Sequence, residues 1–155
     1  MPGKPDTTDE HAWHKYFAVE CNNRAWALTT KDRSPDETEE MLRTAHASAW
    51  HWGVVGSELN HARATMLLAA AHAEAGDGPA ALRYANAMRA YFTARETLDW
   101  ELASTHAIHA HAAWVAGDKT AHAVSYTLAE AAVKAVADPE ERGIVEMTFR
   151  RVPRG

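Results

Sequence analysis

Apolar residues recur along most of the chain at intervals of three and four positions, the spacing that places side chains on one face of an α-helix. The stretches between the prolines are rich in Ala, Leu, Glu and Arg, which favour helical structure. No stretch shows the alternation of apolar and polar residues that is typical of a β-strand. The pattern predicts an all-α protein with six helices, at residues 8–30, 34–56, 57–75, 79–95, 98–116 and 118–136.

Residues that begin and end helices mark the same boundaries. Ser34 precedes Pro35, an order that is typical of a helix start. The run Gly76-Asp77-Gly78-Pro79 indicates the end of one helix and the start of the next. Connections this short place consecutive helices antiparallel. We therefore expect a single domain of three stacked antiparallel helical hairpins, at residues 8–56, 57–95 and 98–137, and a short C-terminal extension at residues 138–155.

An internal repeat agrees with this organisation. Ala75-Gly76-Asp77 recurs 41 positions later as Ala116-Gly117-Asp118, and the pattern Leu-Arg-x-Ala-x-Ala occurs at residues 42–47 and again at residues 82–87. Periods of about 34 to 47 residues are typical of stacked helix pairs.

Residues 69–85, which read AAAHAEAGDGPAALRYA, resemble a tetratricopeptide repeat in their small residues and in the position of the Gly-Asp turn. The resemblance extends over residues 10–137. Residues 45–53 and 60–63 also resemble a group of short bacterial proteins of this type. The resemblance implies a superhelix with a concave groove that holds a peptide or a partner helix. It also implies that Arg63, Met66, Ala107, His111 and Trp114 line this groove.

Composition and charge narrow the functions that the chain can have. The net charge of −5, with His neutral, argues against sequence-independent binding of nucleic acid, which requires a basic face. The single cysteine, Cys21, excludes an internal disulfide and any zinc site that needs two or more cysteines. The N-terminus lacks the apolar segment of a signal peptide, and no apolar run is long enough to span a membrane. We therefore expect a cytoplasmic protein that binds neither nucleic acid nor membrane.

The 10 histidines are unusual, and several fall on helix faces that the repeat directs towards partner helices. Glu58, His61 and His72 lie on one stripe of the third predicted helix, with Thr65 and Leu68 between them. An offset of 41 residues places His106 and His109 on the equivalent stripe of the fifth helix. An offset near 45 places Glu20 and Asn23 on that of the first helix, and His46 on the second helix adds another imidazole. Such groups cost several kcal/mol to bury without partners.

The sequence therefore predicts an interior His/Glu cluster that binds a divalent metal or a small polar ligand. Imidazole and carboxylate donors together suit Zn, Fe, Mn, Ni or Cu, and a neutral His can also act as a general base in a metal-dependent enzyme. The predicted metal ligands are His46, His61, His106, His109, Glu20 and Glu58. The predicted residues of the ligand site or groove are Asn23, Asn60, Arg63, His72, Trp52 and Trp114.

Three alternatives remain open at the level of sequence. The histidines can be buried residues that are satisfied by hydrogen bonds to Thr65, Asn60, Asn23 or water, with no ligand at all. The chain can be a protein–protein interaction module that binds a peptide or partner helix in its concave groove. It can also form a homodimer through the apolar outer face of a terminal hairpin. Whether the chain is an enzyme is not decided by these patterns.

Overall fold

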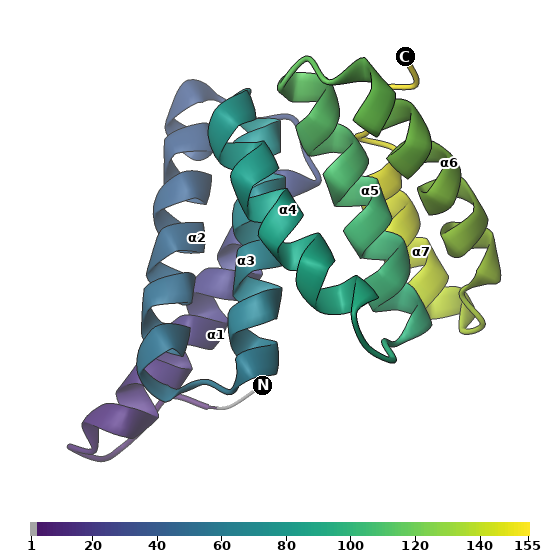
Figure 1. The fold of residues 1–155 in the computed structure, drawn as a ribbon. Helices are drawn as coiled ribbons and strands as arrows, with labels where there is room; N and C mark the ends of the chain where they lie inside the picture. The colour runs from purple at the N-terminus through teal and green to yellow at the C-terminus, as the bar shows by residue number, and fades with distance from the viewer. Residues whose placement is uncertain (1–2) are drawn as a thin grey trace.

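The computed structural model describes residues 3–155, which form seven α-helices and no β-strand (Figure 1). The prediction of an all-α protein is confirmed. The helices are α1 (Glu10–Thr29), α2 (Pro35–Val55), α3 (Glu58–Glu74), α4 (Gly78–Thr93), α5 (Asp99–Val115), α6 (Lys119–Ala135) and α7 (Pro139–Phe149). Among the described residues, no helix has both the length and the apolar character needed to cross a lipid bilayer.

The repeated Ala-Gly-Asp sequence forms the same helix end twice. Gly76 and Gly117 adopt φ values of 78° and 81°, which an L-residue with a side chain rarely adopts. The amide of the following aspartate then donates to a carbonyl five residues back, from Asp77 to His72 over 3.0 Å and from Asp118 to Ala113 over 2.9 Å. This is a Schellman helix end. Each aspartate also accepts a hydrogen bond from the first turn of the next helix, so one short sequence ends α3 or α5 and begins α4 or α6.

Consecutive helices pack against one another, most extensively α1 with α2, α3 with α4, and α5 with α6. Helix α3 also contacts both α1 and α5, while α7 packs against α5 and α6. In Figure 1, α7 lies behind α5. Alanines are the commonest buried residues of α3 and α5 and allow close approach of the helices. The larger Met88 and Phe92 of α4 share one core cluster with both helices, whereas Leu67 of α3 packs on the other side against Leu28 and Met41.

The start of α4 and the end of α5 approach so closely that only glycine fits at residue 78. A Cβ atom there would lie 2.7 Å from the Cα atom of Ala116 and 2.7 Å from the carbonyl oxygen of Val115. Both of these are backbone atoms, so they yield only if the two helices move apart.

We expect Gly78→Ala to lower the free energy of unfolding by about 1–3 kcal/mol, the usual cost of overpacking a tight contact. Gly143→Ala is the matched control, because Gly143 lies inside α7 with no atom within 4 Å of an added Cβ. That variant should gain about 0.5–1 kcal/mol from helix propensity. Urea denaturation followed by circular dichroism measures both, and equal shifts in the same direction would contradict the close approach.

The C-terminal segment reaches across the molecule to the first helices. After α7, the guanidinium group of Arg151 donates to Glu74 at the end of α3, over 3.0 and 2.9 Å, and to Asp32 after α1, over 3.1 Å. Arg33 also donates to Glu74, over 2.7 Å. The Glu74 side chain is only 6% exposed, so this carboxylate is the buried centre of a network that joins the C-terminal segment to the end of α3 and to the connection between α1 and α2.

Candidate functional site

Both predicted glutamate ligands and the predicted groove residue Asn23 lie at the surface. Glu20 and Asn23 on α1 are exposed, and the side chain of Glu58 at the start of α3 is 76% exposed. Glu58 lies 4.0 Å from Arg95, which is at most a weak surface ion pair. These residues are not directed towards the interior that the repeat offset predicts for them.

Two predicted residues near the start of α3 and one near the end of α2 make contacts that hold the turn between these helices. Asn60 closes a capping box with Ser57, whose backbone amide donates to the Asn60 side chain over 3.0 Å. His61 is exposed, and its Nε2–H donates to the carbonyl oxygen of Trp52 over 2.8 Å, near the end of α2. These contacts fix the turn between α2 and α3.

His106 and His109 are buried on α5, as their stripe predicts. His109 Nε2–H donates to Asn86 Oδ1 over 2.9 Å, so its Nδ1 accepts from the hydroxyl of Ser125 over 2.7 Å. Burial, with smaller contributions from Arg89 and His106, lowers the pKa of His109 to about 4. Burial also lowers the pKa of His106, whose Nδ1 has no hydrogen-bond partner among the described residues. His109 is therefore a neutral core histidine with both ring nitrogens satisfied.

His46 on α2 and His72 on α3 do meet. Their Nε2 atoms lie 2.9 Å apart, and His72 Nδ1–H donates to the carboxylate of Asp77 over 3.1 Å. Since the proton of His72 is on Nδ1, its Nε2 is the acceptor and His46 donates. The predicted metal ligand His46 and the predicted groove residue His72 thus form one site.

The other metal candidates are not brought together. In residues 3–155, no group of three or more His, Cys, Asp or Glu side chains lies close enough to hold a metal ion. The reason lies in the repeat itself. An offset of one repeat places equivalent residues on stacked helices, whose axes are about 8–10 Å apart, whereas ligands of one ion lie about 2 Å from it. Residues at equivalent positions of successive repeats therefore lie on different helices, too far apart to bind one ion.

A hollow of about 460 Å³ lies between α7 and the layer formed by α1, α3 and α5. Most of its wall is apolar or aromatic, and a few polar groups lie among these side chains. The lining residues are Asn22, Trp26, Arg63, Met66, Trp100, Ser104, Glu141, Ile144, Val145 and Thr148. Arg63 and Met66 were expected in a concave groove. The wall that α7 contributes was not expected, because the C-terminal extension has no counterpart in the repeat.

Two charged side chains of this hollow differ in their partners. Arg63 Nε donates to Glu101 over 2.8 Å, and its guanidinium group lies 5.6 Å from the centre of the Trp100 ring. The Glu101 side chain is only 4% exposed. Its negative charge offsets the positive charge of Arg63, so the pair carries almost no net charge. Glu141, in the first turn of α7, has no ion-pair partner among the described residues. Partial removal from water and the nearby carboxylates of Asp138 and Asp99 raise its pKa.

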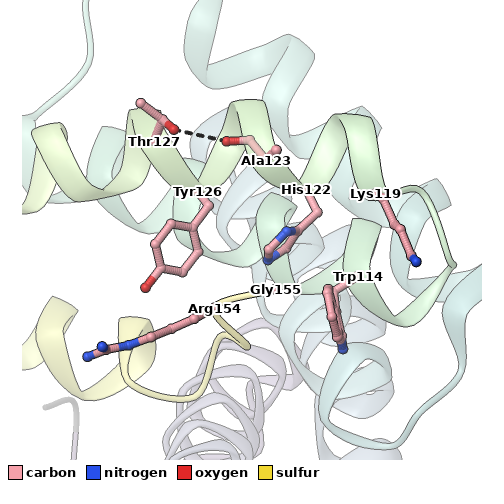
Figure 2. Close-up of a pocket in the computed structure, with 8 residues that line it drawn as sticks. All are labelled: Trp114, Lys119, His122, Ala123, Tyr126, Thr127, Arg154 and Gly155. Carbon is pink, nitrogen blue, oxygen red and sulfur yellow. Dashed lines mark hydrogen bonds between the residues drawn. The ribbon is translucent and has the colours of Figure 1, made fainter.

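A second hollow, of about 410 Å³, lies beside the C-terminal tail at the opposite end of α5 (Figure 2). Trp114, expected to line the groove together with Arg63, lies here instead, with Tyr126 on the other side of His122. His122 Nε2–H donates to the carbonyl oxygen of Pro153 over 2.7 Å, which fixes the tail. This hollow is more open, and Lys119 and Arg154 at its edge are exposed.

Comparison of the chain with protein-family models, with curated proteins and with solved structures finds no match. The resemblance to tetratricopeptide repeats therefore stays a prediction.

Proposed function

We propose that the chain is a small tetratricopeptide-like protein of three helical hairpins that binds a flat, largely apolar molecule carrying an amino group. The binding site is the hollow between α1, α3, α5 and α7. The observation that carries the proposal is the lining of this hollow, in which Trp26 and Trp100 occur together with an unpaired carboxylate, Glu141.

The size of the hollow favours a small molecule over a peptide helix. Sites for small molecules usually enclose about 300–1,000 Å³, a range that includes 460 Å³. A ten-residue helix, about 15 Å long and about 10–12 Å wide, would need roughly 1,200–1,700 Å³. Helix α7 packs against α5 and forms one wall of the hollow, so the hollow is bounded on that side.

The apolar wall favours an aromatic ligand body. Indole rings bind flat aromatic surfaces by stacking or edge contacts, and Met66 adds a polarisable thioether. Ile144 is 62% exposed, and a bound molecule would remove part of this surface from water.

The charges favour a cationic group at the α7 end. Glu101 compensates Arg63, which leaves Glu141 as the uncompensated charge of the lining. The carboxylates of Asp99, Asp138 and Glu140 lie close enough to raise the pKa of Glu141, so the local potential is negative. An ammonium group relieves this repulsion, whereas a carboxylate would add to it.

Two probes of equal size test this proposal, 2-naphthylmethylamine and 2-naphthoate. We expect the amine to bind one molecule per chain at pH 7.5 and to bind at least about tenfold more tightly than the acid, a difference of about 1.4 kcal/mol. Glu141→Gln should remove most of that difference. Isothermal titration calorimetry measures the affinities.

Glu140→Gln is the matched control, because Glu140 precedes Glu141 in the same helical turn but does not line the hollow. It should change the affinity for the amine far less than Glu141→Gln does. Equal affinities for amine and acid, or equal losses in the two variants, would contradict the proposal. Tight binding of a peptide helix with no binding of either naphthalene probe would favour the interaction module instead.

A further inference from the structure

The histidine pair between α2 and α3 has a geometry that fits a metal ion. His46 lies on α2 and His72 on α3. Neither residue lines the hollow between α1, α3, α5 and α7. The Nε2–Nε2 distance is 2.9 Å. Two nitrogen ligands at about 2.0–2.1 Å from one ion lie about 2.9 Å apart when the angle between them is about 90°, and about 3.3 Å apart in a tetrahedron.

One of the two rings is held in place for this role. The Nδ1–H of His72 donates to Asp77, and the ring stacks on Tyr84 at 5.5 Å between ring centres. A histidine ligand usually donates its other N–H to a carboxylate or carbonyl, which fixes the ring and increases its basicity. Because His72 Nε2 carries no proton, its lone pair, which accepts from His46 in the pair, becomes available to an ion once the Nε2 proton of His46 has left.

The other ring is free to adjust. His46 is exposed, and its ring stands at 81° to that of His72, so a rotation is needed before both lone pairs point to one ion. His46 also carries its proton on Nε2 in the unliganded pair. Binding requires the neutral ring to move this proton to Nδ1, which the exposed position allows through solvent water.

We propose that Nε2 of His46 and Nε2 of His72 bind one divalent ion of the late first-row metals, Cu²⁺ or Ni²⁺, in adjacent positions of a square-planar or octahedral shell completed by water. Adjacent positions of such a shell place two nitrogens about 2.9 Å apart, close to their distance in the pair, whereas the tetrahedral sites usual for Zn²⁺ place them about 3.3 Å apart. The proposal does not depend on the proposed amine site.

Charges near the pair act in both directions. The charged Arg83 lies 4.8 Å from the centre of the Tyr84 ring and, after burial and His72, contributes to lowering the pKa of His46. Its positive charge opposes a cation at the pair. The carboxylate of Asp77 compensates for this charge on the other side of His72.

A second pair, His14 and His51, serves as an internal comparison. These rings meet through Nδ1, also at 2.9 Å, between α1 and α2. Nδ1 is next to the attachment point of the side chain, so an ion there would crowd its own helices. Trp50 contacts the ring of His14, and Phe17 contacts the ring of His51. No carboxylate hydrogen bond is found on this pair among residues 3–155.

Titration of tag-free protein with CuSO₄ or NiCl₂, followed by calorimetry, tests the assignment. We expect one saturable high-affinity site per chain, and for Cu²⁺ an electron paramagnetic resonance spectrum with hyperfine coupling to two imidazole nitrogens. Asp77→Asn should weaken binding by about tenfold, the lower end of the usual effect of losing such a partner. Asparagine still caps α4, so this variant should fold.

His46→Ala and His72→Ala should each weaken binding by more than Asp77→Asn does, and the spectrum should then show one imidazole at most. His14→Ala and His51→Ala are the matched controls and should leave the site unchanged. His46 is exposed, so its loss should barely alter the melting temperature without metal. A site that survives His46→Ala, or that is lost in His51→Ala instead, would overturn the proposal, as would binding that does not saturate.

Discussion

Glu74→Ala is expected to lower the free energy of unfolding by about 3–5 kcal/mol, the usual result of removing one partner from a buried ion pair. The Glu74 carboxylate accepts hydrogen bonds from Arg33 and Arg151, and His111 lies 3.8 Å away. Burial alone would raise the pKa of Glu74, but the hydrogen bonds from Arg151 and Arg33 outweigh it and lower that pKa. Without the carboxylate, Arg33 loses its counter-charge and Arg151 keeps only the exposed Asp32.

Glu40→Ala is the matched control for this change. Glu40 also accepts two hydrogen bonds from one guanidinium group, at 2.6 and 2.9 Å from Arg24, but its side chain is 43% exposed. An exposed pair of this kind contributes about 0–1 kcal/mol. Urea denaturation of both variants at pH 7.5 measures the difference. Losses of equal size would contradict the role of Glu74 as the buried link between the C-terminal segment and the first helices.

The second large effect is a loss of stability in mild acid, centred on His109. Its pKa is about 4 in the folded protein and about 6.5 in the unfolded chain. The unfolded chain therefore takes up a proton between these values while the folded protein does not, so stability falls as the pH falls from about 6.5 to about 4. One histidine with this shift contributes about 2–3 kcal/mol, where the lower figure allows for solvent screening.

Other histidines act in the same direction. Burial is the main cause that lowers the pKa values of His46, His51, His106 and His111. The folded protein should therefore lose stability in acid more steeply than His109 alone would cause.

Denaturation curves at several pH values test this expectation with His109→Gln. Its free energy of unfolding should depend less on pH between 6.5 and 4 than that of the unchanged protein. His11→Gln, at the exposed start of α1, controls for the loss of any one histidine. The comparison uses the slope within each protein, so a general loss of stability in His109→Gln does not affect it. Identical slopes in the two variants would contradict the buried, neutral state of His109.

The helices could be predicted because their signals are local. Ser34 with Pro35, and the Gly-Asp turns at residues 76 and 117, set helix ends through contacts within a few residues. The burial of His109 also followed from its place on the face of α5 that the repeat directs towards partner helices. These features depend on spacing along one helix, which the sequence contains.

The sites depend on contacts between distant segments, which spacing does not contain. The stripe that includes Glu58 and His61 is interior only over the part of α3 that neighbouring helices cover, and its first turn is exposed. The meeting of His46 with His72 depends on the packing of α2 against α3. The hollow depends on where α7 packs, and nothing in the repeat predicts the position of a segment outside it.

The most direct test of the proposed site follows the six tryptophan indole N–H signals in a ¹H–¹⁵N spectrum during titration with 2-naphthylmethylamine. Binding in the hollow between α1, α3, α5 and α7 should shift the signals of Trp26 and Trp100, which line it. The signal of Trp114, which lines the hollow beside the C-terminal tail, should stay in place. A titration that shifts Trp114 and leaves Trp26 and Trp100 unchanged would contradict the account.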